Sequence, residues 1–234
     1  MTARGRKYSG PAGIIRGMKT HRQRGFFTRG TVLVLIAALA AGIGLWAAQR
    51  YFAQPPAVEL KLQTARLFPQ PRELPAFSLS SGKDGHVDKS SLAGHWTIVF
   101  LGFTHCADVC PTTLTDMAKA QKIWRSLPTA TRPRLLFVSV DPDRDTPEQL
   151  ANYARFFDAD TLTATAPEPA LGLFAKSLNL VYMKVPQANG DYDMDHSSSL
   201  MLLDPQVRQA GFLRPPLEPE KIAADLIQLG KARP

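Results

Sequence analysis

Short apolar runs alternate with amphipathic stretches through the middle of the chain. The runs 96–101 and 134–140 are rich in β-branched and aromatic residues and have the length of buried strands. Between them, the apolar positions of 111–127 recur at helical spacing, which predicts a helix that packs one face on a sheet. A second helix is expected after Thr146, a capping residue that is followed by proline. The pattern therefore predicts strands and helices in alternation.

The same alternation continues toward the C-terminus. Strands that alternate with helices and end in an antiparallel hairpin indicate an α/β layer fold with a mixed central sheet, here in the order of a thioredoxin-like fold. The remaining expected elements are a short hairpin (77–88), a helix (170–178), a strand (180–185), a polar loop (186–194), a hairpin (200–203 with 209–213) and a last helix (219–229).

The most apolar stretch of the chain precedes this domain. Residues 31–48 carry no charge over 18 positions, which is long enough to cross a bilayer core. Before them, residues 1–30 contain eight Lys/Arg and no acidic residue, and the positive-inside rule keeps such a tail in the cytoplasm. We therefore expect a single-pass protein of the inner (cytoplasmic) membrane whose C-terminal domain faces the periplasm or an equivalent exported side. The expected order is a basic tail (1–30), one transmembrane helix (31–49), a proline-rich linker (50–73) and the thioredoxin-like domain (74–231).

The distribution of charge excludes one class of partner. The net charge of +8 lies entirely in the basic tail, because the rest of the chain has 20 residues of each sign. We therefore expect no nucleic-acid partner. A cleaved signal peptide is the alternative to an anchor, since small residues suited to cleavage occur in the apolar stretch, but the charged lead and the apolar core exceed the usual dimensions of a signal. The domain is exported under either interpretation.

The candidate chemistry lies where the first buried strand ends. Cys106 and Cys110, the only cysteines, are separated by three residues and followed by Pro111, which suits the first turn of a helix. The N-terminus of a helix lowers the pKa of a thiol and favours the thiolate. Two neighbouring thiolates serve either disulfide exchange or the binding of a soft metal, and their spacing alone leaves both uses open.

A histidine could complete a metal site. His196 precedes the strand expected at 200–203, and in a thioredoxin-like sheet the loop entering that strand lies next to the thiol loop. Two thiolates and one imidazole suit copper. His105 adjoins Cys106, but neighbouring side chains of an extended loop tend to point apart. We expect no role at the site for His21, His86 and His95.

Three motifs, in this order after an apolar segment, resemble those of the Sco/SenC family. They are Gly-Phe-Thr-His-Cys-Ala-Asp-Val-Cys-Pro at 102–111, Val-Ser-Val-Asp-Pro-Asp-Arg-Asp-Thr-Pro at 138–147, and Asp-His-Ser at 195–197. The resemblance extends over 74–229. It implies a membrane-anchored, thioredoxin-like copper metallochaperone that helps to assemble the binuclear copper A centre of cytochrome c oxidase subunit II.

The same resemblance implies the ligands and the partners. Cys106, Cys110 and His196 would bind copper, as Cu(I) or Cu(II), which would come from a copper donor protein and pass to subunit II or another acceptor. The main alternative is an enzyme, a membrane-tethered thiol–disulfide oxidoreductase that uses a redox-active Cys106–Cys110 disulfide to reduce the acceptor's cysteines. His196 discriminates the two, because dithiol exchange does not need it. A peroxide-reducing enzyme and a redox or copper sensor are less favoured, since the chain has no Thr-x-x-Cys pattern and no output domain.

The aspartates near these motifs have two interpretations. Asp108, Asp141 and Asp195 could orient the ligands or contact a partner. The carboxylates of 141–145 could instead satisfy backbone donors where a strand ends and a capped helix begins. Two departures from the family pattern are Ala107, where proline is usual, and the absence of glycine from the turn at 206–208.

Overall fold

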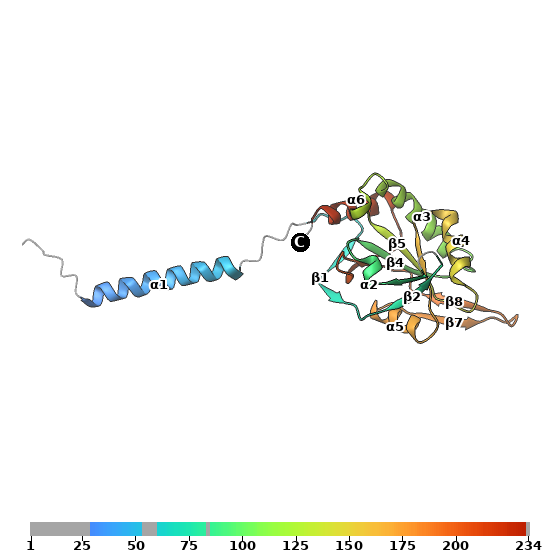
Figure 1. The fold of residues 1–234 in the computed structure, drawn as a ribbon, viewed down its shortest axis with the longest axis horizontal. Coiled ribbons are helices and arrows are strands. Elements are labelled where there is room, and N and C mark those ends of the chain that lie inside the picture. Colours follow the sequence, from blue (N-terminus) through green and yellow to red (C-terminus); the bar gives the residue numbers. More distant parts are fainter. Residues whose placement is uncertain (1–28, 53–59, 83–84, 233–234) are drawn as a thin grey trace, which may run out of the picture. The chain divides into compact units, whose positions relative to one another are not determined.

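The computed structural model describes residues 29–52, 60–82 and 85–232 (Figure 1). The expected basic tail up to residue 28 and the linker residues 53–59 lie outside the described residues. The chain divides into two units, 1–57 and 58–234.

The first unit contains one helix, α1 (Arg29–Phe52). It carries no charged residue between Arg29 and Arg50, and its large apolar side chains are exposed over its length. Its length and composition are sufficient to cross a membrane. An exposed apolar surface of this extent is expected of a helix that is solvated by lipid.

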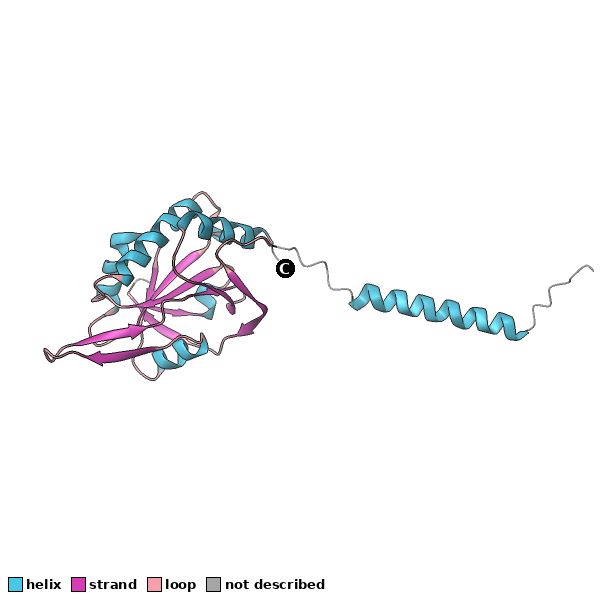
Figure 2. Cartoon of the chain, turned by 180° about the vertical axis from the view of Figure 1, so that it is seen from behind, coloured by secondary structure: helices cyan, strands magenta, loops and turns pink. Residues whose placement is uncertain are grey.

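The second unit is built on a six-stranded mixed sheet (Figure 2). Three neighbouring strands run parallel, and the other three extend the sheet in antiparallel fashion. The central strands are buried along their whole length, in agreement with their apolar sequences. The sheet order is β1 (Arg66–Glu73), β10 (Arg208–Leu213), β9 (Leu200–Leu203), β4 (Thr97–Gly102), β5 (Arg134–Ser139) and β6 (Leu162–Ala164).

Helices cover the sheet. The helix that follows the cysteine motif packs against the last helix along one side, and the helix after residue 169 lies on the opposite side (Figure 1). The predicted capped start at Thr146 is confirmed, because its hydroxyl accepts from the Gln149 amide and the Gln149 side chain accepts from the Thr146 amide. The helices are α2 (Lys89–Leu92), α3 (Val109–Trp124), the 3₁₀ turn η1 (Thr129–Thr131), α4 (Pro147–Phe157), α5 (Ala170–Ser177) and α6 (Pro219–Lys231).

Two hairpins stand outside the main sheet. The predicted hairpin at 77–88 is confirmed as β2 (Ser78–Ser81) and β3 (Gly85–Asp88). The second pairs β7 (Tyr182–Pro186) with β8 (Tyr192–His196), so the predicted polar loop over 186–194 is wrong at its end. Asp191 and Asp193 contributed to the polar composition of this segment, although Tyr192, Met194 and His196 alternate with acidic residues as in a strand.

The linker was expected over 50–73, but residues 66–73 form a strand. Strand β1 pairs with β10, and just before it the amides of Gln63, Thr64 and Ala65 donate to the Asp225 carboxylate of α6 at 2.7–3.1 Å. The two prolines of β1 suggested a linker, but they are tolerated because β1 is an edge strand whose register with β10 shifts between Leu67 and Arg72.

The turn between β9 and β10 has valine at the position where glycine is usual. Val207 adopts a positive φ of 59°, a conformation in which glycine is favoured. The Asp204 carboxylate accepts from the amides of Gln206 and Arg208 at 3.0 and 2.9 Å. These bonds hold the turn without a glycine.

We expect Asp225→Asn to destabilise the domain by about 1–3 kcal/mol at neutral pH, because an amide cannot accept all of these hydrogen bonds. Burial by itself would raise the pKa of Asp225, but the bonds from Ala65, Gln63 and Thr64 outweigh burial and lower it. The stabilising effect of the carboxylate is therefore complete above the ordinary pKa near ~4 and is lost as the pH falls through the lowered pKa.

Chemical denaturation at pH 7 and at roughly pH 2.5 checks this prediction, with the exposed Glu148→Gln as the control. The difference in unfolding free energy between the wild-type chain and Asp225→Asn should shrink at the lower pH. An undiminished difference would contradict the role of the ionised carboxylate.

Candidate metal centre

The two thiols lie between the end of β4 and the first turn of α3. Helix α3 begins at Val109, two residues earlier than predicted, so that Cys110 is its second residue. Cys110 is fully buried, whereas Cys106 is partly exposed. The Cys110 amide donates to the Cys106 sulfur at 3.4 Å. A backbone N–H in the first turn of a helix has no carbonyl partner within the helix, and here it bonds to the sulfur instead.

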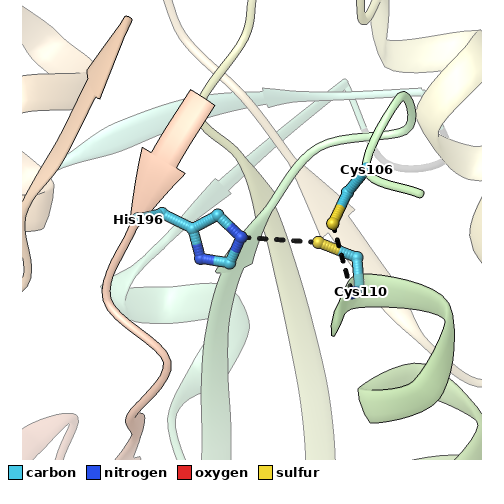
Figure 3. Close-up of side chains that lie close together, drawn as sticks. All are labelled: Cys106, Cys110 and His196. Atoms are coloured by element: carbon cyan, nitrogen blue, oxygen red, sulfur yellow. Dashed lines mark hydrogen bonds between the residues drawn. The ribbon is translucent and has the colours of Figure 1, made fainter. Parts of the chain in front are cut away.

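His196 meets these sulfurs from the other side. It is the last residue of β8, and its Nε2 lies 3.5 Å from the Cys110 Sγ (Figure 3). The ligand atoms of Cys106, Cys110 and His196 all lie within 4.8 Å of one another. The fold therefore brings together the three residues that the sequence suggested as ligands, although 86 positions separate Cys110 from His196.

The imidazole of His196 is held in a defined orientation. The rings of Phe100 and Phe103 meet it edge to face, with centroid distances of 6.0 and 6.1 Å. Its Nδ1 lies 3.2 Å from the Ser197 carbonyl oxygen, which favours the proton on Nδ1 and leaves Nε2 free to bind a metal. Burial lowers the pKa of His196, so the ring is neutral at neutral pH.

The environment of Cys110 differs from the prediction. The position at a helix N-terminus suggested a lowered pKa, but burial raises the pKa of Cys110 well above its ordinary value. Desolvation is the largest contribution, because this sulfur lies inside the apolar core, and it outweighs the position in the first turn of the helix. A metal that binds here must therefore displace the proton of the Cys110 thiol.

Gly102 makes room for the buried sulfur. A Cβ at this position would lie 2.7 Å from the Cys110 Sγ and 2.7 Å from a ring carbon of Phe137. Both distances are shorter than a van der Waals contact, and Phe137 is fully buried. The glycine at the end of β4 is thus part of the geometry of the site.

We expect Gly102→Ala to weaken Cu(I) binding by about tenfold and to cost about 1–3 kcal/mol of stability, since the added methyl group forces Cys110 away from His196. Competition with a Cu(I) chelator under anaerobic conditions measures the first effect. Gly230→Ala is the control, because a Cβ there would meet no atom within 4 Å. An unchanged affinity in Gly102→Ala would show that the position of the Cys110 sulfur is not limiting.

Asp145 anchors the cysteine loop. Its buried carboxylate accepts from the Thr104 amide at 2.9 Å, from the Thr104 hydroxyl at 2.5 Å and from the Ser139 hydroxyl at 2.5 Å. Thr104 lies two residues before Cys106, and Ser139 is the last residue of β5. These bonds tie the loop to the sheet. The carboxylate satisfies buried donors, but only one of them is a backbone amide, and it lies 41 positions away and not at the local strand end or helix start.

Asp141 and Arg144 anchor the hairpin that carries the histidine. Asp141 accepts from the Tyr192 hydroxyl at 2.9 Å and from Arg144 Nε at 2.5 Å. Arg144 also donates to the Tyr192 carbonyl oxygen at 3.1 Å, and its guanidinium lies 3.8 Å from the Tyr192 ring centroid. One five-residue turn after β5 therefore holds both ligand-bearing segments in place.

The other predicted residues lie outside the cluster. Asp108 and Asp195 are exposed, and Asp141 contacts the hairpin rather than a ligand atom. The His105 ring is directed toward Thr104 and Asp145, at 3.1 and 3.7 Å.

The remaining described histidines, His86 and His95, have partners outside the cluster. His95 bonds to the Arg132 carbonyl oxygen, His86 lies 3.6 Å from Asp88, and His21 is outside the described residues. The structure adds Tyr192 and Asp145 to the residues that shape the site. Asp145 lay in the quoted acidic motif, whereas nothing in the sequence marked Tyr192.

The donor set favours a soft metal ion. Two sulfurs and one imidazole nitrogen converge without a carboxylate among them, a combination that suits Cu(I). Cys106 remains partly exposed, so an incoming ligand can approach the site from its side. The arrangement is fit both to hold a three-coordinate ion and to release it.

Comparisons with known proteins show what this chain is similar to. The family model described as SCO1/SenC matches residues 68–231. A putative copper-binding protein of Stutzerimonas stutzeri is 34% identical over 165 residues, which are 70% of this chain and 79% of that protein. The mitochondrial protein SCO1 homolog 1 of Arabidopsis thaliana is 35% identical over 137 residues, 58% of this chain, and the match spans only 40% of that relative.

The solved structures give the same result. The copper-bound ScoI of Bradyrhizobium japonicum superposes with a TM-score of 0.61 at 33% identity, over 67% of this chain and 98% of that structure. This similarity confirms the predicted thioredoxin-like fold of the second unit.

Proposed function

Since this chain belongs to the SCO1/SenC family, we propose that it is a copper metallochaperone of cytochrome c oxidase assembly, with Cys106, Cys110 and His196 as its copper ligands. The convergence of the two sulfurs and the imidazole Nε2 within 4.8 Å is the observation that carries the proposal. Copper is the cargo of the protein, and delivery to the copper A centre of subunit II is the function of the family.

The site suits a transfer by exchange of ligands. Cu(I) binds both sulfurs as thiolates, so the proton of Cys110 and any proton on Cys106 are released to solvent, while the neutral His196 supplies a nitrogen without gaining or losing a proton. An acceptor thiolate then adds at the partly exposed Cys106 side, and each new Cu–S bond replaces one to the donor. A low coordination number leaves room for this addition.

The location is part of the same proposal. Helix α1 supports a membrane anchor by its length, its apolar composition and its exposed surface. The excess of Lys/Arg before it favours a cytoplasmic N-terminus, which would place the copper domain on the periplasmic or an equivalent exported side.

Transfer to an acceptor tests the function. The full chain in detergent is loaded anaerobically with one Cu(I) and mixed with the metal-free soluble copper domain of subunit II, and the copper on each protein is measured after separation. We expect the wild-type chain to deliver copper and His196→Ala to retain too little copper to do so. His95→Ala is the control, since His95 bonds only to a backbone carbonyl of the loop before β5.

The same variants decide between the chaperone and the oxidoreductase. A thiol reductase would reduce a disulfide in the acceptor domain at equal rates with and without His196. Failure of the wild-type chain to bind Cu(I), together with rapid disulfide reduction, would replace the chaperone with the reductase.

A further inference from the structure

Only one face of the β7–β8 hairpin serves the metal centre. Side chains alternate between the two faces of a strand, so Tyr192 and His196 share the inner face, which the turn at 141–145 and the cysteine loop contact. The outer face is formed by Met183 and Val185 of β7 together with Val181 just before the strand, and Asp195 and Asp193 on β8 lie opposite Met183 and Val185.

The apolar residues of this outer face are unusually exposed. Val181 is 72% and Met183 is 61% exposed, at alternate positions where a solvated strand ordinarily carries polar side chains. An exposed apolar stripe of this kind marks an interaction site, and methionine is enriched in protein interfaces. The stripe lies on the strand that pairs with β8, and Tyr182 lies directly opposite His196.

The acidic residues beside the stripe determine the kind of partner. Asp193 and Asp195 are exposed, and neither forms an ion pair with another described residue. The face is therefore apolar along one strand and negatively charged along the other. It complements a surface that carries Lys or Arg beside apolar side chains.

The inner side of the hairpin is joined to the turn at 141–145. On its inner side Tyr192 is held by Asp141 and Arg144, and Lys184 forms an ion pair with Asp143 at 2.8 Å. Binding of a partner to the outer face therefore loses little free energy to ordering of the hairpin.

We propose that the outer face of the β7–β8 hairpin is the docking surface for the protein that takes copper from this site. The inference rests on the proposed function and adds the surface that selects the acceptor. A second copy of the chain would bring its own Asp193 and Asp195 against the same charges, and an anionic lipid surface would be repelled. A cationic and apolar protein surface is the occupant that the charges favour.

The experiment measures docking separately from copper binding. The full chain in detergent is titrated with the metal-free copper domain of subunit II, and the dissociation constant is measured at low and at high salt. Two variants alter the face, Val181→Ser/Met183→Ser and Asp193→Lys. Phe156→Ser on α4 is the control, because Phe156 is 85% exposed but lies on another element. Cu(I) affinity is measured for every variant.

We expect both hairpin variants to bind one Cu(I) like the wild type but to lose about tenfold or more in affinity for the copper domain, with the control unchanged. Salt should weaken docking of the wild type and have less effect on Asp193→Lys. Equal affinities for all variants, or no association of the wild type, would overturn the docking surface even if Cu(I) binding is intact. Self-association that the variants abolish would assign the face to a second copy instead. Failure of the wild type to bind Cu(I) would refute the proposed function, not the docking result.

Discussion

Cys110→Ser is expected to weaken Cu(I) binding by more than about a hundredfold, beyond the 10–100-fold range in which residues outside the ligand set act. A hydroxyl is a hard ligand for this ion and does not ionise in the buried position that Cys110 occupies. Serine is slightly smaller than cysteine, so the fold should persist. Chelator competition under anaerobic conditions gives the affinity.

Thr113→Ser serves as the control for this prediction, because Thr113 is a buried residue of the same helix and is not one of the three clustered residues. Its Cu(I) affinity should equal that of the wild type. Tight binding by Cys110→Ser would mean that Cys106 and His196 hold copper by themselves, and the three-ligand site would be abandoned.

Asp145→Ala should destabilise the domain by about 3–5 kcal/mol, because the Thr104 amide and the hydroxyls of Thr104 and Ser139 lose their shared acceptor in a buried place. The released cysteine loop should also bind Cu(I) more weakly. Denaturant unfolding measures the stability, and chelator competition at a temperature where the variant remains folded measures the affinity.

Asp143→Ala is the matched control, since Asp143 belongs to the same turn but is exposed and bonds only to Lys184 on the hairpin. Its loss should change stability by no more than about 1 kcal/mol. Equal effects of the two substitutions would show that the charge of the turn matters and that the buried bonds do not.

Local pattern was sufficient to predict most elements of the fold. The strands at 97–102 and 134–139 and the capped helix after Thr146 have apolar spacing and capping residues that determine them locally. Strand β1 was not predicted, because its prolines have the signature of a linker and only pairing with β10 makes it a strand. Strand β6 has three residues, too few for a periodic signal.

The convergence of Cys106, Cys110 and His196 could be predicted from the sequence, but the environment of these residues could not. The spacing of the cysteines and the position of His196 before a later strand suggested that the three would meet. The pKa of Cys110 depends on how deeply the fold buries the sulfur, and the bond from Tyr192 to Asp141 joins residues 51 positions apart. Such long-range contacts leave no local signal in a single sequence.

The turn at 141–145 has a consequence for the timing of metal capture. Bringing together two segments that are 86 residues apart requires closing a long loop, which carries a large entropic cost. Because Asp145 holds Thr104 and Asp141 holds Tyr192, that cost is met when the domain folds, before any copper arrives. On the proposed function, copper would therefore meet sulfur and nitrogen atoms that the folded domain already holds close together. The metal-free protein would then bind the next ion without a further loss of chain entropy.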